Sequence, residues 1–400
     1  MSGNIGANIR RERDRCGWSQ ARLAREVCRV AGVQGEPVGR QEVSRWETGK
    51  RKPREWLPFI AAALGVPVGA LTEPQKPAEP PLPTLADYLP TGDPLAPLSA
   101  RAGRRIGMGQ VDDLQQRVHG LRLADDVLAG GDLIRPALRE LRSAVKLYRE
   151  GSHSGEVGRE LLRQVGELAQ IAGWIASDAG QYVEAESIYR LGLSAARQAE
   201  DDTLAGNLAG SLAYQLSNTG REVEGIQLAR AALDGAGTDA PAKARALYLD
   251  RVAWAHTKAG QAQPAMRALG EASEALSQDS EGSEGPPYLY WVDSGELQVM
   301  ESRVYTELRR PLRAVPLLRD VLDRYDATHT RELALYLSWL AIALADANEP
   351  EEAAATAERV ITLSADVASE RTAERVRVVL ARLDDYRDVP EVRAVLDGAA

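Results

Sequence analysis

The sequence has few of the residues from which enzymes, metal sites and disulfide frameworks are built. Its 400 residues include 2 Cys, 4 His and a single Phe. The histidines, His119, His153, His256 and His329, have no cysteine or carboxylate at zinc-like spacing. No Gly-x-Ser-x-Gly elbow, Gly-Lys-Ser/Thr phosphate loop or Gly-x-Gly-x-x-Gly fingerprint occurs. We therefore expect no enzymatic activity, no cofactor and no metal.

The two cysteines and the lack of long apolar runs bear on where the protein works. Cys16 and Cys28 lie near the start of an acidic, Arg-rich chain without a signal-type leader, which is typical of a reducing cytoplasm. Two free thiols are favoured over a redox-active disulfide. No apolar run reaches the roughly 18 residues needed to cross a bilayer. We expect a cytoplasmic protein with no membrane partner, and the abundance of Ala, Arg, Leu and Gly is typical of GC-rich bacterial genes.

Charge is divided unevenly along the chain, whose length predicts two or more domains. Residues 1–76 hold 14 Lys and Arg against 8 Asp and Glu, a net charge of +6. Residues 77–400 hold 35 against 50, a net charge of −15. Only the N-terminal part is suited to approach a polyanion such as DNA, since the acidic remainder would be repelled by it.

The segment 19–54 carries the pattern of two helices joined by a turn rich in Gly and Pro. Ser19 is a helix N-cap residue that can accept a hydrogen bond from the backbone N–H of Arg22. Gly49 stands where a left-handed residue would end the second helix. The apolar positions at helical spacing are Leu23, Ala24 and Val27 in the first helix, and Val43 and Trp46 in the second.

In the strings Gly17-Trp18-Ser19-Gln20, Leu23-Ala24 and Val43-Ser44-Arg45-Trp46-Glu47-Thr48-Gly49, residues 4–71 resemble the XRE family, the phage-repressor type of helix-turn-helix protein. The resemblance implies a domain that binds double-stranded DNA. Between Ala24 and Glu47 this chain is longer than is usual in the family. We expect the extra segment, Cys28 to Gly39, to form a longer second helix and a looped turn.

The resemblance also implies residue roles. Arg40, Gln41 and Arg45 are candidate base readers, and Arg13 and Glu47 are expected to form a structural ion pair. The candidates for phosphate contacts are Gln20, Ser44, Lys50, Arg51, Lys52 and Arg54. The alternative for these side chains is an ordinary solvated helix face and charged loop.

A proline-rich stretch separates this region from the rest of the chain. Prolines occur at positions 74, 77, 80, 81, 83, 90, 94 and 97, and such a stretch is stiff and extended because it lacks regular backbone donors. We expect a helix-turn-helix domain over 1–73, a linker over 74–107 and a helical body over 108–400. Leu85 and Tyr88 could attach part of the linker to a neighbouring surface.

The body carries an internal repeat. Gly180, Gly220 and Gly260 lie forty residues apart, and fainter copies follow at Arg309 and Asn348. Each glycine has an aromatic residue six positions earlier and a small residue five positions later; at the −6 offset the fourth copy breaks the pattern with an arginine. The aromatic residues are Trp174, Tyr214 and Trp254, the small ones are Ala185, Gly225 and Ala265, and the arginine is Arg303.

Each repeat unit is therefore expected to be a helix, a tight turn and a second helix, and stacking such hairpins gives a solenoid. The pattern resembles a tetratricopeptide-repeat array with slightly longer repeats. The predicted fold is all-α, with a five-helix helix-turn-helix domain followed by an α-solenoid of tetratricopeptide-like hairpins.

This combination resembles bacterial regulators, including actinobacterial and quorum-sensing types, whose solenoid dimerises and senses a ligand. We expect a homodimeric, sequence-specific DNA-binding transcription regulator that responds to a peptide or small-molecule signal or a partner protein. The alternatives are a protein-interaction scaffold and a constitutive dimeric repressor without a ligand. Candidate ligand-binding residues are Asn207, Gln215, Asn218 and Trp254. For the amides the competing interpretation is a solvated or turn-capping role, and for the tryptophan it is inter-repeat core.

Overall fold

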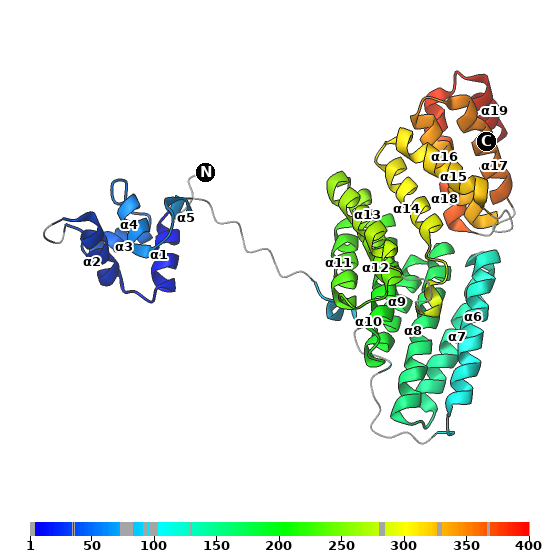
Figure 1. Cartoon of the computed structure of the whole chain (residues 1–400), viewed down its shortest axis with the longest axis horizontal. Coiled ribbons are helices and arrows are strands. Elements are labelled where there is room, and N and C mark those ends of the chain that lie inside the picture. The colour runs from blue at the N-terminus through cyan, green and yellow to red at the C-terminus, as the bar shows by residue number, and fades with distance from the viewer. Residues whose placement is uncertain are drawn as a thin grey trace. The chain divides into compact units, whose positions relative to one another are not determined.

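The computed structural model of the chain is built of helices, as predicted (Figure 1). It describes residues 5–33, 35, 37–72, 83–90, 95, 103–128, 130–279, 285–325, 330–365 and 369–399. In these ranges there is no β-strand, and none of the helices is long and apolar enough to cross a membrane. The chain divides into two compact units, Met1–Pro81 and Leu82–Ala400.

The first unit consists of five helices around one apolar core, in agreement with the predicted five-helix domain. Ser19 caps the second helix, and its hydroxyl accepts a hydrogen bond from the N–H of Arg22 at 3.2 Å. Leu23, Val43 and Trp46 are buried in the core. The five helices are α1 (Ile5–Arg15), α2 (Gln20–Ala31), α3 (Arg40–Glu47), α4 (Leu57–Leu64) and α5 (Val68–Thr72).

The backbones of α1 and α3 approach so closely that only glycine fits between them. A Cβ atom added to Gly6 of α1 would lie 2.2 Å from the carbonyl oxygen of Trp46 and 2.8 Å from that of Glu47. Because both neighbours are backbone atoms, no side-chain movement can relieve such a contact. Gly6 therefore fixes how closely α3 lies against α1.

The extra segment between the two helices of the motif begins as expected, with a longer helix, and residues 34 and 36 after it lie outside the described residues. α2 continues to Ala31, and Gly32 ends it in the left-handed conformation, with φ of +67°. The loop leads back to the core, where Val38 is buried and its carbonyl oxygen accepts a weak hydrogen bond from the thiol of Cys28 at 3.7 Å. Cys28 and Cys16 are both free thiols.

The second unit begins with a short segment that the proline content places in the linker. Leu85–Tyr88 forms the 3-10 helix η1, and Tyr88 and Leu95 are buried in the core of the second unit. Arg190 donates a hydrogen bond to the carbonyl oxygen of Tyr88 at 2.9 Å, and its guanidinium lies 5.6 Å from the centre of the Tyr88 ring. The expected attachment through Leu85 and Tyr88 is confirmed, whereas most of the prolines lie outside the described residues.

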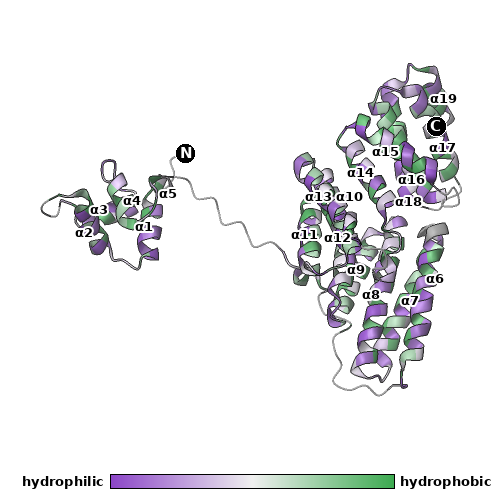
Figure 2. Ribbon diagram, in the orientation of Figure 1, coloured by the Kyte–Doolittle hydropathy of each residue, from purple (hydrophilic) through white to green (hydrophobic). Residues whose placement is uncertain are grey.

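The remaining helices of the second unit run side by side in antiparallel pairs (Figure 1). Figure 2 shows polar and apolar residues on most of them, as expected of helices that bury one face. Their bounds are α6 (Met108–Val127), α7 (Gly130–Glu150), α8 (Gly155–Asp178), α9 (Tyr182–Gln198), α10 (Asp202–Asn218), α11 (Glu222–Ala236), α12 (Ala242–Lys258), α13 (Ala262–Ser277), α14 (Ser294–Glu307), α15 (Pro311–Arg324), α16 (Thr330–Asp346), α17 (Pro350–Ser364), α18 (Glu370–Leu383) and α19 (Pro390–Gly398), with the 3-10 helices η2 (Pro287–Leu289) and η3 (Asp384–Tyr386).

All five predicted repeat turns are present, and each contains a residue in the left-handed conformation. Gly180, Gly220 and Gly260 have φ of +76°, +82° and +70°. In the two fainter copies the same place is taken by Arg309 and Asn348, with φ of +54° and +64°. A left-handed arginine is uncommon, because its Cβ crowds the neighbouring carbonyl. The hairpin geometry is therefore kept where glycine is absent.

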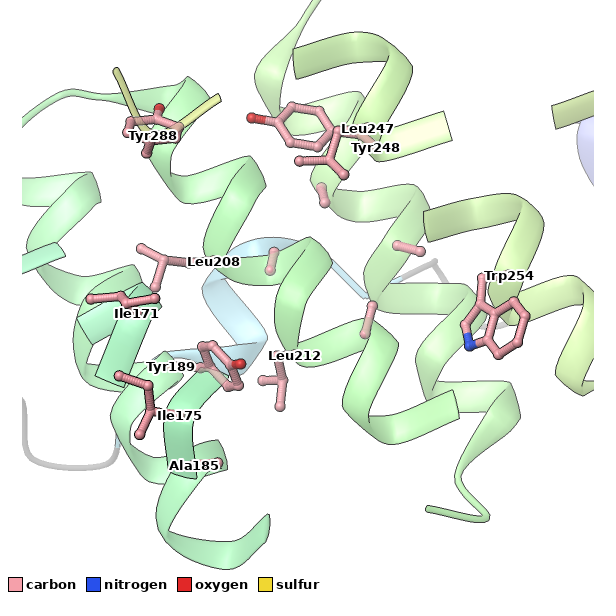
Figure 3. Close-up of a cluster of buried hydrophobic side chains, with 14 of the residues drawn as sticks. Ile171, Ile175, Ala185, Tyr189, Leu208, Leu212, Leu247, Tyr248, Trp254 and Tyr288 are labelled. Carbon is pink, nitrogen blue, oxygen red and sulfur yellow. The ribbon is translucent and has the colours of Figure 1, made fainter. Parts of the chain in front are cut away.

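The small residue after each turn lets the second helix of the hairpin approach the first. Ala185, Ala265, Ala314 and Ala353 are fully buried. At the equivalent position in the second copy, a Cβ on Gly225 would lie 2.2 Å from the hydroxyl oxygen of Ser217. Figure 3 shows how large side chains such as Ile175, Tyr189 and Leu212 fill the space that the close helices leave.

The second unit closes on itself through contacts between its leading and trailing helices. Arg331 at the start of α16 forms an ion pair with Asp125 near the end of α6, with Nη1 and Oδ1 3.2 Å apart. Its Nη2 also donates to the carbonyl oxygen of Asp125 at 2.7 Å. At the end of α8, Asp178 accepts a hydrogen bond from the hydroxyl of Ser369 at 2.9 Å. Helices that are about 200 residues apart in sequence are thus in contact.

Candidate functional site

The first candidate site is the exposed face of α3. Val43, Trp46 and Glu47 are buried on the inner side of this helix. The three predicted base readers, Arg40, Gln41 and Arg45, are all exposed: Gln41 and Arg45 lie on the opposite side, and Arg40 is the first residue of the helix. The structure therefore exposes all three predicted base readers on one short helix whose inner side is buried in the core.

The predicted ion pair between Arg13 and Glu47 is confirmed. Arg13 Nε lies 2.6 Å from Glu47 Oε1, and Arg13 Nη2 lies 3.3 Å from Glu47 Oε2. The hydrogen bonds to Glu47 raise the pKa of Arg13, so the guanidinium stays charged. Gln20, a predicted phosphate contact, also donates to Glu47 Oε2 at 2.7 Å. One of its two amide N–H groups is therefore engaged inside the domain.

Glu42 is an acidic residue on the polar side of α3, the side that the sequence predicts to face DNA. Its carboxylate pairs with Arg45 at 3.3 Å and with Arg51 at 2.7 Å. Because the carboxylate contacts both cations, it holds two predicted DNA-contacting side chains close to each other. It also lowers the net positive charge of this surface.

The basic residues that follow α3 are connected to it through the backbone. The N–H of Arg51 donates to the carbonyl oxygen of Arg45 at 3.1 Å. Thr48 donates to the carbonyl oxygen of Ser44 at 2.7 Å, and the Ser44 side chain is half-buried. The remaining predicted phosphate contacts, Lys50, Arg51, Lys52 and Arg54, are all exposed.

The second candidate site is a cavity of about 310 Å³ in the second unit. Its helical lining comes from α6, α8, α10, α12, α14, α16 and α18. Five of these helices, α8, α10, α12, α14 and α16, are each the first helix of a repeat hairpin. Tyr290 and Trp291 after η2, and Tyr325 after α15, complete the lining.

The aromatic rings at three repeat positions and the ring of Trp339 on α16 form a column. Ring centres are 5.7 Å apart for Trp174 and Tyr214, 5.8 Å for Tyr214 and Trp254, and 5.7 Å for Trp254 and Trp339. Arg303, which breaks the aromatic pattern in sequence, packs within this column. Its guanidinium lies 4.5 Å from the ring centre of Trp254 and 5.4 Å from that of Trp339.

Only one of the four predicted ligand-binding residues lines the cavity. Asn207 does so, and it is buried. Gln215 donates to the carbonyl oxygen of Tyr182 at 2.8 Å, and Asn218 donates to that of Tyr214 at 2.8 Å. Trp254 donates to the side-chain oxygen of Asn218 at 3.3 Å. These three side chains therefore have partners within the helix stack.

The cavity is lined by an excess of positive charge that the sequence reasoning did not anticipate. Six of its described lining residues are arginines and three carry carboxylates. Arg303 was the one sequence signal, because it occupies an aromatic repeat position. The arginines are Arg122, Arg251, Arg303, Arg331, Arg371 and Arg375, and the carboxylates are Asp125, Glu296 and Glu332.

The electrostatic effect of these arginines is visible at Tyr214. Burial raises the pKa of this phenol, but the positive charges of Arg303, Arg371 and Arg251 outweigh burial and leave the pKa below its usual value. Arg303 also donates a hydrogen bond to the phenol oxygen at 2.6 Å. Burial lowers the pKa of Arg375 to about 10, opposed by Glu307 and reinforced by Arg303. The arginines therefore favour negative charge around Tyr214, whereas burial raises the pKa of the lining carboxyls Asp125 and Glu296.

Metal binding has no obvious location in the part of the chain that the structure describes. It contains no group of three or more His, Cys, Asp or Glu side chains able to hold a metal ion.

Comparison with known proteins identifies the first unit. Residues 4–74 match the family model of a helix-turn-helix domain. No curated protein matches the chain significantly.

Solved structures with a similar fold include the following two. BtubC (BKLC) from P. vanneervenii is 17% identical, with 59% of this chain and 91% of that chain covered and a TM-score of 0.42. PlcR from Bacillus thuringiensis, solved in complex with the peptide PapR7 and DNA, is 13% identical, with 90% and 99% covered and a TM-score of 0.34. Neither likeness bears on the function of this chain.

Proposed function

Because residues 4–74 form a helix-turn-helix domain, we propose that the protein is a sequence-specific DNA-binding transcription regulator that reads DNA with α3. The observation that carries this proposal is the exposed face of α3, where Arg40, Gln41 and Arg45 lie together. Arginine and glutamine are the side chains that form bidentate hydrogen bonds with guanine and adenine edges in the major groove.

The charges around α3 support the same function. Lys50, Arg51, Lys52 and Arg54 are exposed directly after the helix, and residues 1–76 have a net charge of +6. Contacts to phosphates fix the position of a protein on the duplex, while base contacts supply sequence specificity. In this proposal the loop after α3 contacts the phosphates, and α3 itself contacts the bases.

The protein acts as a homodimer in this proposal, and its helical body receives a signal. A single helix-turn-helix module buries too little surface for tight specific binding, whereas two modules on half-sites about one helical turn apart combine their binding energies. The cavity of about 310 Å³ in the second unit supports the sensing role. The second candidate, a body that only dimerises or binds another protein, predicts no ligand in this cavity.

The test is selection of binding sequences from random DNA with the full-length protein, followed by fluorescence anisotropy on the selected site. Arg45→Ala should weaken binding to this site by about 10- to 100-fold, equivalent to 1–3 kcal/mol. Its effect on unrelated DNA should be much smaller, because base contacts contribute little there.

Arg139→Ala is the matched control, because it removes an exposed arginine from α7 in the other unit. It should leave the affinity for the selected site unchanged. Failure to enrich any sequence, or an Arg45→Ala variant with full affinity, would contradict the proposal. Sedimentation analysis of the same protein, alone and on DNA, tests the dimer separately.

A further inference from the structure

The arginines of the cavity differ in how well their charge is compensated. Arg331 contacts Asp125 and Glu332, with shortest N–O distances of 3.2 Å and 2.9 Å. The third carboxylate of the lining, Glu296, accepts a hydrogen bond from the Tyr336 hydroxyl at 2.6 Å. These three carboxylates are therefore already occupied by residues other than Arg303 and Arg375.

Arg303 and Arg375 have incomplete sets of partners among the described residues. Arg303 is buried without a carboxylate in ion-pair contact, and its Nε atom has no hydrogen-bond acceptor, although Tyr214, Asp250 and Glu296 lie near enough to raise its pKa against the effect of burial. Arg375 Nε donates to the Ser338 hydroxyl at 3.0 Å, and the nearest carboxylate, that of Glu307, lies 3.9 Å from Nη1, whereas the buried Nη2 atom has no acceptor. Unsatisfied N–H groups of buried cations are costly, since desolvation is not compensated by a hydrogen bond.

The two arginines lie against the same aromatic ring. The guanidinium of Arg375 is 3.5 Å from the centre of the Trp339 ring, and that of Arg303 is 5.4 Å from it. Stacking on an aromatic face partly compensates each positive charge, but it leaves the in-plane N–H donors available. Two like charges near one ring also repel each other, and a shared anion would relieve that repulsion.

Part of the lining is flat and apolar. Trp174, Tyr214 and Trp339 present aromatic rings, and Ile171, Met300 and Leu335 add aliphatic surface. A volume of about 310 Å³ is at the lower end of the range for small-molecule sites, which is about 300–1,000 Å³. The space therefore suits a metabolite-sized molecule and is small for a peptide of several residues.

We propose that this cavity binds a small organic anion that has a carboxylate on a flat apolar body. The guanidinium groups of Arg303 and Arg375, two residues of the cavity lining, receive the carboxylate, and the neighbouring aromatic rings pack against the body. Charge-assisted hydrogen bonds from arginine suit a planar carboxylate. This assignment deepens the sensing role proposed above, on which its regulatory meaning rests, but the binding itself does not depend on that role.

The test uses the full-length protein and pairs of ligands that differ only in charge. Benzoate, 2-naphthoate and indole-3-acetate are each compared by isothermal titration calorimetry with the corresponding uncharged primary amide. We expect at least one carboxylate to bind about 10-fold or more tightly than its amide, which is the effect of one charge-assisted hydrogen bond.

Arg303→Met and Arg375→Met should each weaken carboxylate binding by about 10-fold or more while changing amide binding little. Unchanged amide affinity and circular dichroism show that a variant is folded. Arg319→Met is the matched control, because Arg319 on α15 is half-exposed, pairs with Glu352 and does not line the cavity. It should bind the carboxylate like the parent protein.

Three results would overturn the proposal: no binding of any of the carboxylates, equal affinity for carboxylates and amides, or full affinity in both arginine variants. Binding of a short peptide with a free C-terminus, but of none of the aryl carboxylates, would overturn the small-molecule assignment in favour of a peptide. Repeating the DNA titrations with bound carboxylate separates the two proposals. Tight ligand binding without any effect on DNA affinity leaves the site standing and rejects the sensing role.

Discussion

Glu47 on α3 accepts hydrogen bonds from side chains of two other helices, Arg13 of α1 and Gln20 of α2. The side chains of Arg13 and Glu47 are only 11% and 3% exposed. Because the charges are compensated by each other, removing one of them leaves the other buried without its partner. The orientation of α3 therefore depends on both residues of this pair.

We expect Arg13→Met to destabilise the first unit by about 3–5 kcal/mol, the usual effect of breaking a buried pair from one side. The double variant Arg13→Met/Glu47→Leu should lose less, because it leaves no unpaired charge. Urea unfolding of the full-length protein measures both. Arg10→Met is the control, since the Arg10–Asp14 pair is exposed and contributes about 0.5 kcal/mol or less. A double variant less stable than Arg13→Met would contradict the argument.

His256 on α12 is the buried histidine whose protonation should affect stability. Arg230 of α11 can only donate, and its Nη2 lies 3.2 Å from Nε2 of His256, so Nε2 is the acceptor and the ring is neutral. Nδ1 then donates to the Gln261 side chain at 2.7 Å. Burial lowers the pKa of His256, the hydrogen bond to Gln261 opposes this, and Arg230 and Arg267 lower it further.

A histidine with a lowered pKa in the folded state binds protons more readily when unfolded. Stability from this site is therefore complete above the usual pKa of 6.5 and decreases as the pH falls through and below that value. The midpoint of urea unfolding should fall less between about pH 7.5 and pH 5.5 in His256→Gln than in the parent protein. Equal decreases in the two proteins would show that His256 does not contribute.

At the scale of the helical elements, the turn glycine Gly220 acts through backbone conformation alone. Gly220 has φ of +82°, and a Cβ atom added to it would meet no other atom within 4 Å. Gly270 lies inside α13 with a similarly open environment. The two positions therefore differ in backbone conformation and not in packing.

The same substitution should have opposite effects at these two glycines. Gly220→Ala should lower the free energy of unfolding by about 1–2 kcal/mol, because alanine is strained in the left-handed region. Gly270→Ala should raise it by about 0.5–1 kcal/mol, because alanine is the better helix former. Thermal or urea unfolding of the two variants measures the difference. Destabilisation by both substitutions would show that packing, and not backbone strain, controls these sites.

The elements were the most predictable part of the structure, because their signals are local. Ser19, Leu23 and Gly49 define the ends and the buried face of the helices of the motif within a few residues of sequence. The forty-residue spacing of Gly180, Gly220 and Gly260 located the hairpins, and even the left-handed conformations of Arg309 and Asn348 fall at the predicted repeat positions.

The cavity was much less predictable, because it depends on contacts between distant residues. Gln215 and Asn218 lie on α10, a helix that lines the cavity, yet their amides donate hydrogen bonds to the backbone carbonyl oxygens of Tyr182 and Tyr214. Arg303 is recognisable in sequence only as a broken repeat position, whereas in the structure it packs on Trp254 and Trp339. This packing of Arg303 depends on how three hairpins stack against one another, and no local sequence pattern specifies that stacking.

At the scale of the second unit, buried charges close the stack of helices. Arg331 of α16 is 4% exposed and contacts Asp125 of α6, which is 8% exposed. Arg331 also lies 3.7 Å from Asp178 of α8. One guanidinium thus connects the leading helix, a repeat helix and a trailing helix around the cavity. Its removal leaves Asp125 and Asp178 buried with fewer compensating charges.

We expect Arg331→Met to lower the free energy of unfolding by about 3–5 kcal/mol and to speed amide hydrogen exchange in α6 and α18. Burial already raises the pKa of Asp125, and Arg331 opposes this, so the variant should raise it further. A carboxyl with a raised folded pKa binds protons on folding, and stability then increases as the pH falls. The loss of stability in the variant should therefore be smaller at about pH 5 than at about pH 7.5.

Arg319→Met, which breaks an exposed pair, should change stability by no more than about 1 kcal/mol at either pH. Unchanged exchange in α6 would show that this ion pair does not hold the stack closed.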